Sequence, residues 1–263
     1  MSKLSKEEKF LDLSDYGRST AKFLAERLKN TSVTPIQVTI CFGICGLIAI
    51  YCILNNHFYA AGFFLIWKSI IDAMDGELSR IKQTPSYTGR YLDSVFDIIL
   101  NFMILMAIAS ISTASFWLTL LAFVCVQLQG TLYNYYYVIL RNNSVGGDTT
   151  SKIFETETPT AMPGESQRTV NIMFAIFVAL YGVYDRVIYA LDANAYKERT
   201  FPSWFMTIVS CYGLGFQLLL IALMLALGLV NYIIPFFIFY TILLPILIII
   251  RRTFLVGNLL AKM

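Results

Sequence analysis

Charge is scarce in this sequence. Only 14% of its 263 residues are charged, against about 25% in an ordinary soluble domain, and 57% are apolar or aromatic. This composition argues against a soluble globule and a disordered chain, and a net charge of +3 gives no reason to expect a nucleic-acid partner. One histidine and five scattered cysteines also fail to form the clustered pattern of a zinc site or a disulfide framework.

Long apolar runs dominate the sequence instead. A transmembrane helix needs about 20 predominantly apolar residues. Runs of this kind lie at 36–54, 58–81, 91–111, 116–140, 170–191, 204–230 and 232–250. The predicted fold class is therefore all-α, a polytopic transmembrane bundle of six to seven spans, in an integral multi-pass membrane protein.

Two units are expected along the chain. Residues 1–35 form a polar N-terminal arm on the cytoplasmic side, and residues 36–263 form the transmembrane domain. Within the arm, residues 14–29 alternate polar and apolar side chains with a helical period, which predicts an amphipathic helix in the membrane interface. A solvated tail is the alternative for this segment.

The distribution of lysine and arginine predicts the orientation of the first spans. Basic residues concentrate in the arm, at 80–90 and at 141–168, so these segments are expected in the cytoplasm. Beyond residue 168, the preference of basic residues for the cytoplasm does not give one consistent orientation. Seven spans place Arg251 and Arg252 outside, whereas six spans, with 170–191 not crossing, return them inside. Seven is slightly favoured, because Asp185 and Arg186 could pair near the outer interface.

One polar stretch, residues 72–97, interrupts the apolar pattern. It reads DAMDGELSRIKQTPSYTGRYLDSVFD and contains Asp72, Asp75, Asp93 and Asp97 at the end of one apolar run and the start of the next. An aspartate at the membrane centre costs about 2.5–3.5 kcal/mol, and less near an interface. Four of them therefore need a cation or a polar cavity, and a solvated acidic hairpin does not explain the set.

The spacing of these acids predicts that they meet. At about 100° per residue, Asp72 and Asp75 lie on one helix face, and steps of four place Asp93 and Asp97 on one stripe of the next helix. Clustered carboxylates repel unless a cation joins them. Mg²⁺, or Mn²⁺, suits such oxygen ligands and polarises a phosphoryl group, while a carboxylate can act as a general base.

This stretch resembles the signature of the CDP-alcohol phosphotransferase (phosphatidyltransferase) family, class I, which is DxxDGxxAR-x8-GxxxDxxxD. The matching residues keep every spacing: Asp72, Asp75, Gly76, Arg80, Gly89, Asp93 and Asp97. Ser79 stands where the family usually has alanine.

The resemblance implies an integral membrane transferase of phospholipid biosynthesis that moves a substituted phosphoryl group from a CDP-alcohol to a second alcohol and releases CMP. It implies divalent metal at the four aspartates, with Asp97 also as proton acceptor. It implies CDP contacts at Gly76, Ser79, Arg80, Ser86 and Gly89, with Gln37 and Thr39 as further candidates. It also implies a homodimer whose active site faces the cytoplasm, in a bacterial inner membrane or the endoplasmic reticulum.

Three functions remain open from the sequence. The favoured donor is CDP-diacylglycerol, with inositol, inositol phosphate, glycerol phosphate or serine as acceptor. In the alternative, CDP-choline or CDP-ethanolamine donates its head group to diacylglycerol. A cation transporter that uses the acids as its ion path is the third hypothesis. Membrane lipids are expected partners in each case, and nucleic acid is not.

Overall fold

The structure, a computed structural model, describes residues 9–143, 151–197 and 201–255. Throughout these ranges the regular elements are helices, as the sequence predicts. The α-helices are α1 (Arg18–Leu28), α2 (Pro35–Leu54), α3 (Phe58–Lys82), α4 (Tyr87–Ser110), α5 (Phe116–Asn143), α6 (Gln167–Leu191), α7 (Ser203–Val209), α8 (Leu214–Ala226), α9 (Val230–Tyr240) and α10 (Leu243–Ile250). A 3₁₀ turn, η1 (Leu13–Asp15), precedes α1.

Local sequence signals set the ends of the helices that carry the acidic signature. The α2 helix begins at Pro35 behind a capping box formed by Thr34 and Gln37. The α3 helix ends at Gln83, whose φ of 55° is left-handed, and α4 begins after Ser86, whose hydroxyl accepts a hydrogen bond from the backbone of Gly89. The link between α3 and α4 is therefore short, so the two helices run antiparallel, and α2 packs against both.

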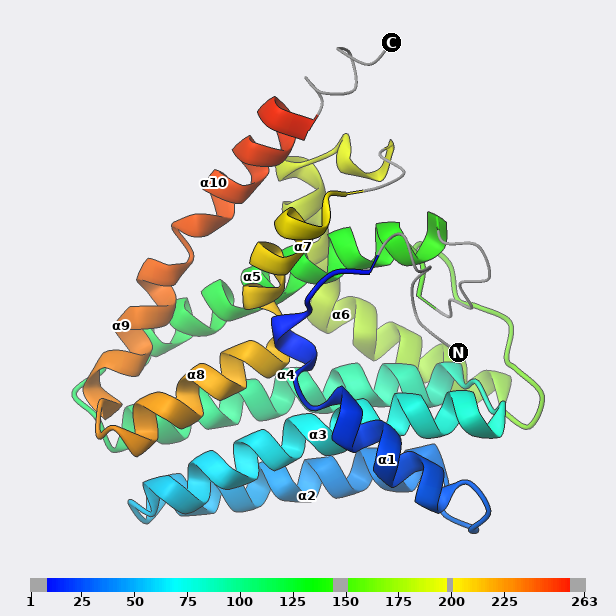
Figure 1. Ribbon diagram of the computed structural model, residues 1–263, viewed down its shortest axis with the longest axis horizontal. Helices are drawn as coiled ribbons and strands as arrows, with labels where there is room; N and C mark the ends of the chain where they lie inside the picture. The colour runs from blue at the N-terminus through cyan, green and yellow to red at the C-terminus, as the bar shows by residue number, and fades with distance from the viewer. Residues whose placement is uncertain (1–8, 144–150, 198–200, 256–263) are drawn as a thin grey trace.

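The helices α2 to α5 lie in a stack, with α8 packed against α3 (Figure 1). Their shared core contains fully buried Phe42, Leu65 and Ile104. At Gly62 a Cβ would lie 3.2 Å from the backbone oxygen of Ala222, so a larger residue would push α3 away from α8. This tight packing fixes α3, the helix that carries Asp72 and Asp75.

The N-terminal arm packs into the helical body. In α1, Ala21 and Ala25 are completely buried, and the backbone N–H of Leu13 donates to the hydroxyl of Ser210. The Tyr133 hydroxyl on α5 donates to Asp12 at 2.6 Å. The described part of the arm is therefore not a solvated tail, and the predicted helix forms. Its position in the membrane interface stays a prediction.

Five helical segments are long and apolar enough to cross a membrane: α2, α4, α5, α6 and the segment Val230–Thr253. The pair formed by Ser203–Tyr212 and Leu214–Ala226, bent by 54°, would be a sixth. The α3 helix carries too many charged residues to be counted among them. The described residues thus hold five to six candidate spans by length and composition, and six is the lower end of the predicted range.

The helix α6 begins and ends on the same side of the bundle. Glu165, just before its start, binds the first turn of α4. Asp192, just after its end, accepts a hydrogen bond from Tyr136 at 2.7 Å and pairs with Arg251. Tyr136 lies twenty residues, or about 30 Å, beyond the start of α5 at Phe116, and a crossing α6 would have ended near that start.

This arrangement favours the six-span alternative over seven spans. In it α3 crosses despite its charged residues, whereas α6 does not cross although it is long and apolar enough. Asp185 and Arg186 do not mark an outer interface, because both line the cavity that contains the signature aspartates. Arg251, which pairs with Asp192, therefore lies at the same end of the bundle as that cavity. The physical reason is that α6 runs obliquely to the stack of α2 to α5 instead of antiparallel to α5 (Figure 1).

Candidate active site

A large cavity opens between the N-terminal residues, α2 to α6, the start of α8 and the segment 151–166. Its volume is about 1480 Å³. Pockets for drug-sized ligands hold about 300–1,000 Å³, so this cavity has room for a nucleotide and a second polar substrate together. All four signature aspartates line it.

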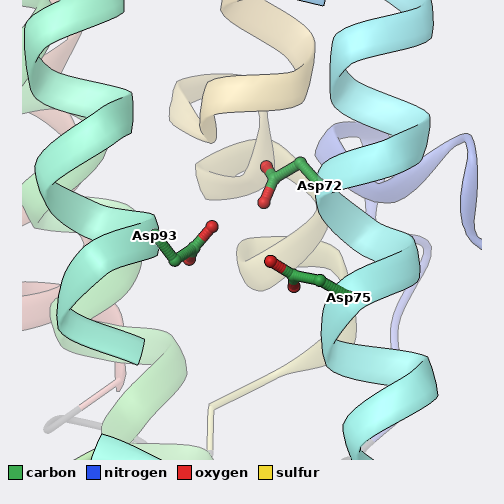
Figure 2. Close-up of side chains that lie close together, drawn as sticks. All are labelled: Asp72, Asp75 and Asp93. Carbon is green, nitrogen blue, oxygen red and sulfur yellow. The ribbon is translucent and has the colours of Figure 1, made fainter. Parts of the chain in front are cut away.

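Three of the four signature aspartates converge inside the cavity. Asp72 and Asp75 extend from α3 and Asp93 extends from α4, and the three carboxylates point toward one another (Figure 2). Each offers an oxygen that lies within 4.8 Å of the others. We call Asp72, Asp75 and Asp93 the carboxylate cluster. The antiparallel α3–α4 hairpin produces it, as the helical spacing predicts.

The carboxylate cluster fits a divalent metal ion. The Oδ1 atom of Asp93 is buried and has no hydrogen-bond partner among the described residues, which is costly for a charged oxygen unless a cation binds it. An all-oxygen ligand set suits Mg²⁺ or Mn²⁺. Thr39, a buried residue of α2, donates its hydroxyl to Oδ2 of Asp75 at 2.7 Å and so orients that carboxylate.

Asp97 lies one helical turn beyond Asp93 and has a different partner. The ammonium of Lys68 donates to its Oδ1 at 2.6 Å. Lys68 is completely buried on α3, four residues before Asp72. The sequence analysis missed this lysine, although a charged residue inside an apolar run is itself a signal of function. A share of Asp97 in metal binding stays a prediction.

Arg80, predicted to contact the CDP moiety, lies on the cavity wall. Its Nη2 is 2.7 Å from Oε1 of Glu77, one turn earlier on α3, and Nη1 of Arg18 reaches the same oxygen at 3.6 Å. Glu77 therefore joins the signature helix to the N-terminal arm. A Cβ at Gly76 would meet only the Arg80 guanidinium, at 3.5 Å, so the backbone there is open to the cavity.

Ser86 and Gly89, two further CDP candidates, form the N-terminal cap of α4. The Gly89 N–H donates to the Ser86 hydroxyl at 2.8 Å, and that hydroxyl donates to Oε1 of Glu165 at 2.8 Å. The backbone of Thr88 donates to the same carboxylate at 2.7 Å, and Tyr87 donates to Oε2 at 3.1 Å. Glu165 thus binds the positive end of a helix.

The hydrogen bonds at Glu165 also set its charge state. Burial raises the pKa of Glu165, but the hydrogen bonds from Thr88, Ser86 and Tyr87 outweigh burial, and the pKa lies below its ordinary value. A second loop carboxylate, Glu155, pairs with Arg90 and accepts from the Tyr91 hydroxyl at 3.2 Å. Both glutamates therefore fasten the segment 151–166 to the first turns of α4.

The remaining CDP candidates have mainly local partners. Ser79 lines the cavity and donates its hydroxyl to the backbone of Thr84 at 2.9 Å, which shapes the α3–α4 link. Gln37 closes the α2 capping box through Thr34 at 2.9 Å and does not line the cavity. Thr39 lines the cavity but is engaged with Asp75.

The all-helical bundle and the carboxylate cluster in a nucleotide-sized cavity are compatible with a membrane enzyme of phosphoryl transfer. The family model of CDP-alcohol phosphatidyltransferases matches residues 32–250. The chain belongs to the CDP-alcohol phosphatidyltransferase family. The family generally depends on a divalent metal. Membership favours an enzyme over the cation transporter.

A sequence relative gives a more specific comparison. The chain is 31% identical over 91 residues to the CDP-diacylglycerol–serine O-phosphatidyltransferase of Bacillus subtilis (strain 168). The alignment covers 35% of this chain and 51% of that protein. The chain therefore spans about half the length of the relative that it matches.

Proposed function

We propose that this chain transfers a phosphatidyl group from CDP-diacylglycerol to the hydroxyl of a small polar alcohol, with serine as the first acceptor to test, and releases CMP. The observation that carries the proposal is the carboxylate cluster, with the unpartnered Oδ1 of Asp93, inside a cavity of about 1480 Å³. The name of the Bacillus subtilis relative supports both the donor and the acceptor.

The cavity wall also suits a zwitterionic acceptor. Arg186 and Asp185 both line the cavity; the guanidinium group would bind a carboxylate and the carboxylate would bind an ammonium group. Inositol and glycerol phosphate carry no ammonium group and would leave Asp185 without a partner from the substrate. This difference in chemistry supports serine over those acceptors.

The chain's own residues would position the donor as follows. Gly76 leaves room for the pyrophosphate against α3, and Arg80, held by Glu77, faces the phosphate charge. Ser86 and Gly89 order the first turn of α4 beside it. Asp72, Asp75 and Asp93 would hold Mg²⁺ or Mn²⁺, which when bound neutralises charge on the pyrophosphate and on departing CMP.

Asp97 would act as the general base. It accepts the proton of the acceptor hydroxyl, whose oxygen forms a new bond to the phosphorus of the phosphatidyl group. The bond from that phosphorus to the bridging oxygen of CMP breaks, and CMP leaves with the electron pair. As in other phosphoryl transfers, positioning and electrostatics would account for most of the rate.

The proposed active site faces the cytoplasm. The basic links at 80–90 and 141–168 lie at the same ends of α3, α4 and α5 as the site. Cationic links of this kind stay in the cytoplasm. Lipid tails would remain in the bilayer while the nucleotide and the acceptor enter from water. A homodimer, as implied by the family resemblance, is part of the proposal, and cross-linking in native membranes tests it.

The decisive assay uses purified protein in lipid nanodiscs with CDP-diacylglycerol labelled in its acyl chains, Mg²⁺ and a panel of alcohols. We expect serine to yield labelled phospholipid and an equal amount of CMP, with no turnover by Asp97→Asn. Turnover of another alcohol would correct the acceptor. Product from CDP-choline and diacylglycerol would correct the donor, and absence of CMP with every CDP-alcohol would contradict the proposed function.

A further inference from the structure

Lys68 is a buried cation at the inner end of the proposed active site. Its side chain is 0% exposed, its Nζ lies 2.6 Å from Oδ1 of Asp97, and it sits 4.7 Å from the centroid of the Phe42 ring. Within the described residues, the Asp97 carboxylate receives a side-chain hydrogen bond only from Lys68. Asp97 itself lines the cavity.

A structural role alone explains this pair poorly. Desolvating a lysine and an aspartate costs several kcal/mol per ion, and replacing a buried ion pair by apolar residues is often neutral or stabilising. An apolar residue at position 68 would match the surrounding run, which reads FLIWKSII. A buried charge that stability does not require is a candidate for function.

The helical register places the pair one turn deeper than the carboxylate cluster. Lys68 precedes Asp72 by four residues on α3, and Asp97 follows Asp93 by four on α4. Because α3 and α4 are antiparallel, both steps lead away from the α3–α4 link and into the bundle. The site therefore has two layers, with three carboxylates near the link and the Lys68–Asp97 pair beneath them.

We propose that Lys68 is a positioning residue that holds Oδ1 of Asp97 and so orients this carboxylate, with its second oxygen toward the acceptor hydroxyl. The ammonium binds Oδ1 and restricts rotation of the carboxylate, and Oδ2 remains for the proton. This inference rests on the proposed function, because it assigns the geometry behind the role of Asp97 as base.

The positive charge of Lys68 should also affect metal binding, in a way that an ordinary packing defect would not. Lys68 carries a positive charge close to three acidic side chains, and it competes with any cation that binds them. Removing that charge should strengthen divalent-metal binding while turnover falls. A misfolded site would lose both together. The two quantities therefore move in opposite directions only if Lys68 acts through position and charge.

The test compares wild type, Lys68→Met, Asp97→Asn and the double variant as full chains in nanodiscs. Three quantities are measured: thermal unfolding, Mn²⁺ binding by electron paramagnetic resonance, and kcat and KM for CMP release. Lys29→Met is the matched control, because Lys29 pairs with Glu26 at 3.0 Å on the exposed face of α1.

We expect Lys68→Met to unfold at a lower temperature than wild type, because Asp97 loses its counter-charge, and to keep the donor KM. It should bind Mn²⁺ about 3- to 10-fold more tightly and lower kcat by about 100-fold or more. The double variant should be no slower than Asp97→Asn, and Lys29→Met should match wild type. A kcat near the wild-type value in Lys68→Met, or weaker Mn²⁺ binding, overturns the inference.

A second variant, Lys68→Gln, is used in case Lys68→Met does not fold, because glutamine donates a hydrogen bond without carrying a charge. If Lys68→Met does not fold, a turnover of Lys68→Gln between wild type and Asp97→Asn supports the inference, and unchanged turnover overturns it. Failure of both variants to fold assigns Lys68 a structural role and also overturns it. Wild type that releases no CMP from any CDP-alcohol contradicts the proposed function, whereas active wild type with active Lys68→Met contradicts only this inference.

Discussion

Glu165→Gln should destabilise the start of α4 in a pH-dependent way. The Glu165 carboxylate accepts four hydrogen bonds, from the hydroxyl of Ser86 and the backbone N–H groups of Tyr87, Thr88 and Met162. Glutamine keeps the size of the side chain but has one acceptor oxygen in place of two. Its NH₂ group would face N–H donors, so the bonds to one side of the carboxylate are lost.

The size of the effect follows from those bonds. Hydrogen bonds to a charged group contribute about 1.5–3 kcal/mol when buried, and a negative charge at a helix N-terminus adds about 0.3–1 kcal/mol. Glu165 is partly exposed, and water screens part of both contributions. The retained oxygen keeps some of the bonding. We therefore expect Glu165→Gln to lower the free energy of unfolding by about 1–2 kcal/mol at pH 7.

The sign of the pH dependence follows from the pKa. Burial raises the pKa of Glu165, but the hydrogen bonds outweigh it, so the pKa in the folded protein lies below its ordinary value. In the unfolded chain a glutamate has a pKa of about 4.3. The stabilisation is therefore complete above about pH 5 and is lost as the pH falls through the lowered folded pKa. Wild type and Glu165→Gln should converge in acid.

Thermal unfolding in nanodiscs at pH 7 and near pH 3 measures the effect. Glu157→Gln is the matched control, because Glu157 is an exposed glutamate of the same segment that does not line the cavity. A loss of equal size at both pH values, or one no larger than that of Glu157→Gln, would refute the reasoning. A raised donor KM should accompany the loss, because the first turn of α4 leads into Gly89 and Asp93.

Three further substitutions have defined outcomes. Asp97→Asn should lower CMP release by about 10²–10⁴-fold while equilibrium binding of the CDP-alcohol persists; retained turnover would remove Asp97 from its role. Thr39→Val deletes the hydrogen-bond donor to Asp75 and should weaken Mn²⁺ binding about 10- to 100-fold, as measured by paramagnetic resonance. Unchanged binding would show that the hydroxyl does not orient the carboxylate. Arg251→Met leaves Asp192 buried without its main counter-charge and should cost about 3–5 kcal/mol in thermal unfolding, whereas the double variant Arg251→Met/Asp192→Asn should recover part of it.

The spacing of the signature was enough to predict that α3 and α4 bring Asp72, Asp75 and Asp93 together; it did not predict that Asp97 pairs with Lys68. Steps of three and four place side chains on one helix face, and the Pro85 link is too short for anything but an antiparallel hairpin. The helix ends at Thr34 and Ser86 follow the usual capping chemistry. Local rules of this kind depend on neighbours in sequence, so a single chain suffices to apply them.

Contacts between distant segments could not be predicted in the same way. Glu155 and Glu165 bind the start of α4 from a polar segment without periodicity, so nothing in the sequence sets their register. The end of α6 is fixed by Asp192 and Arg251, which are far apart along the chain. Lys68 was predictable, because its charge breaks an apolar run one turn before Asp72.

The proposed transfer reaction requires a divalent cation bound between α3 and α4. Crystals or cryo-EM samples of the full chain with Mn²⁺ and a CDP-alcohol would locate the ion directly, by anomalous scattering in the first case. We expect Mn²⁺ to be bound by carboxylate oxygens of Asp72, Asp75 and Asp93, next to the pyrophosphate of the CDP-alcohol. Metal bound elsewhere, or a CDP-alcohol seated in the cavity with those three carboxylates turned away from it, would contradict the account.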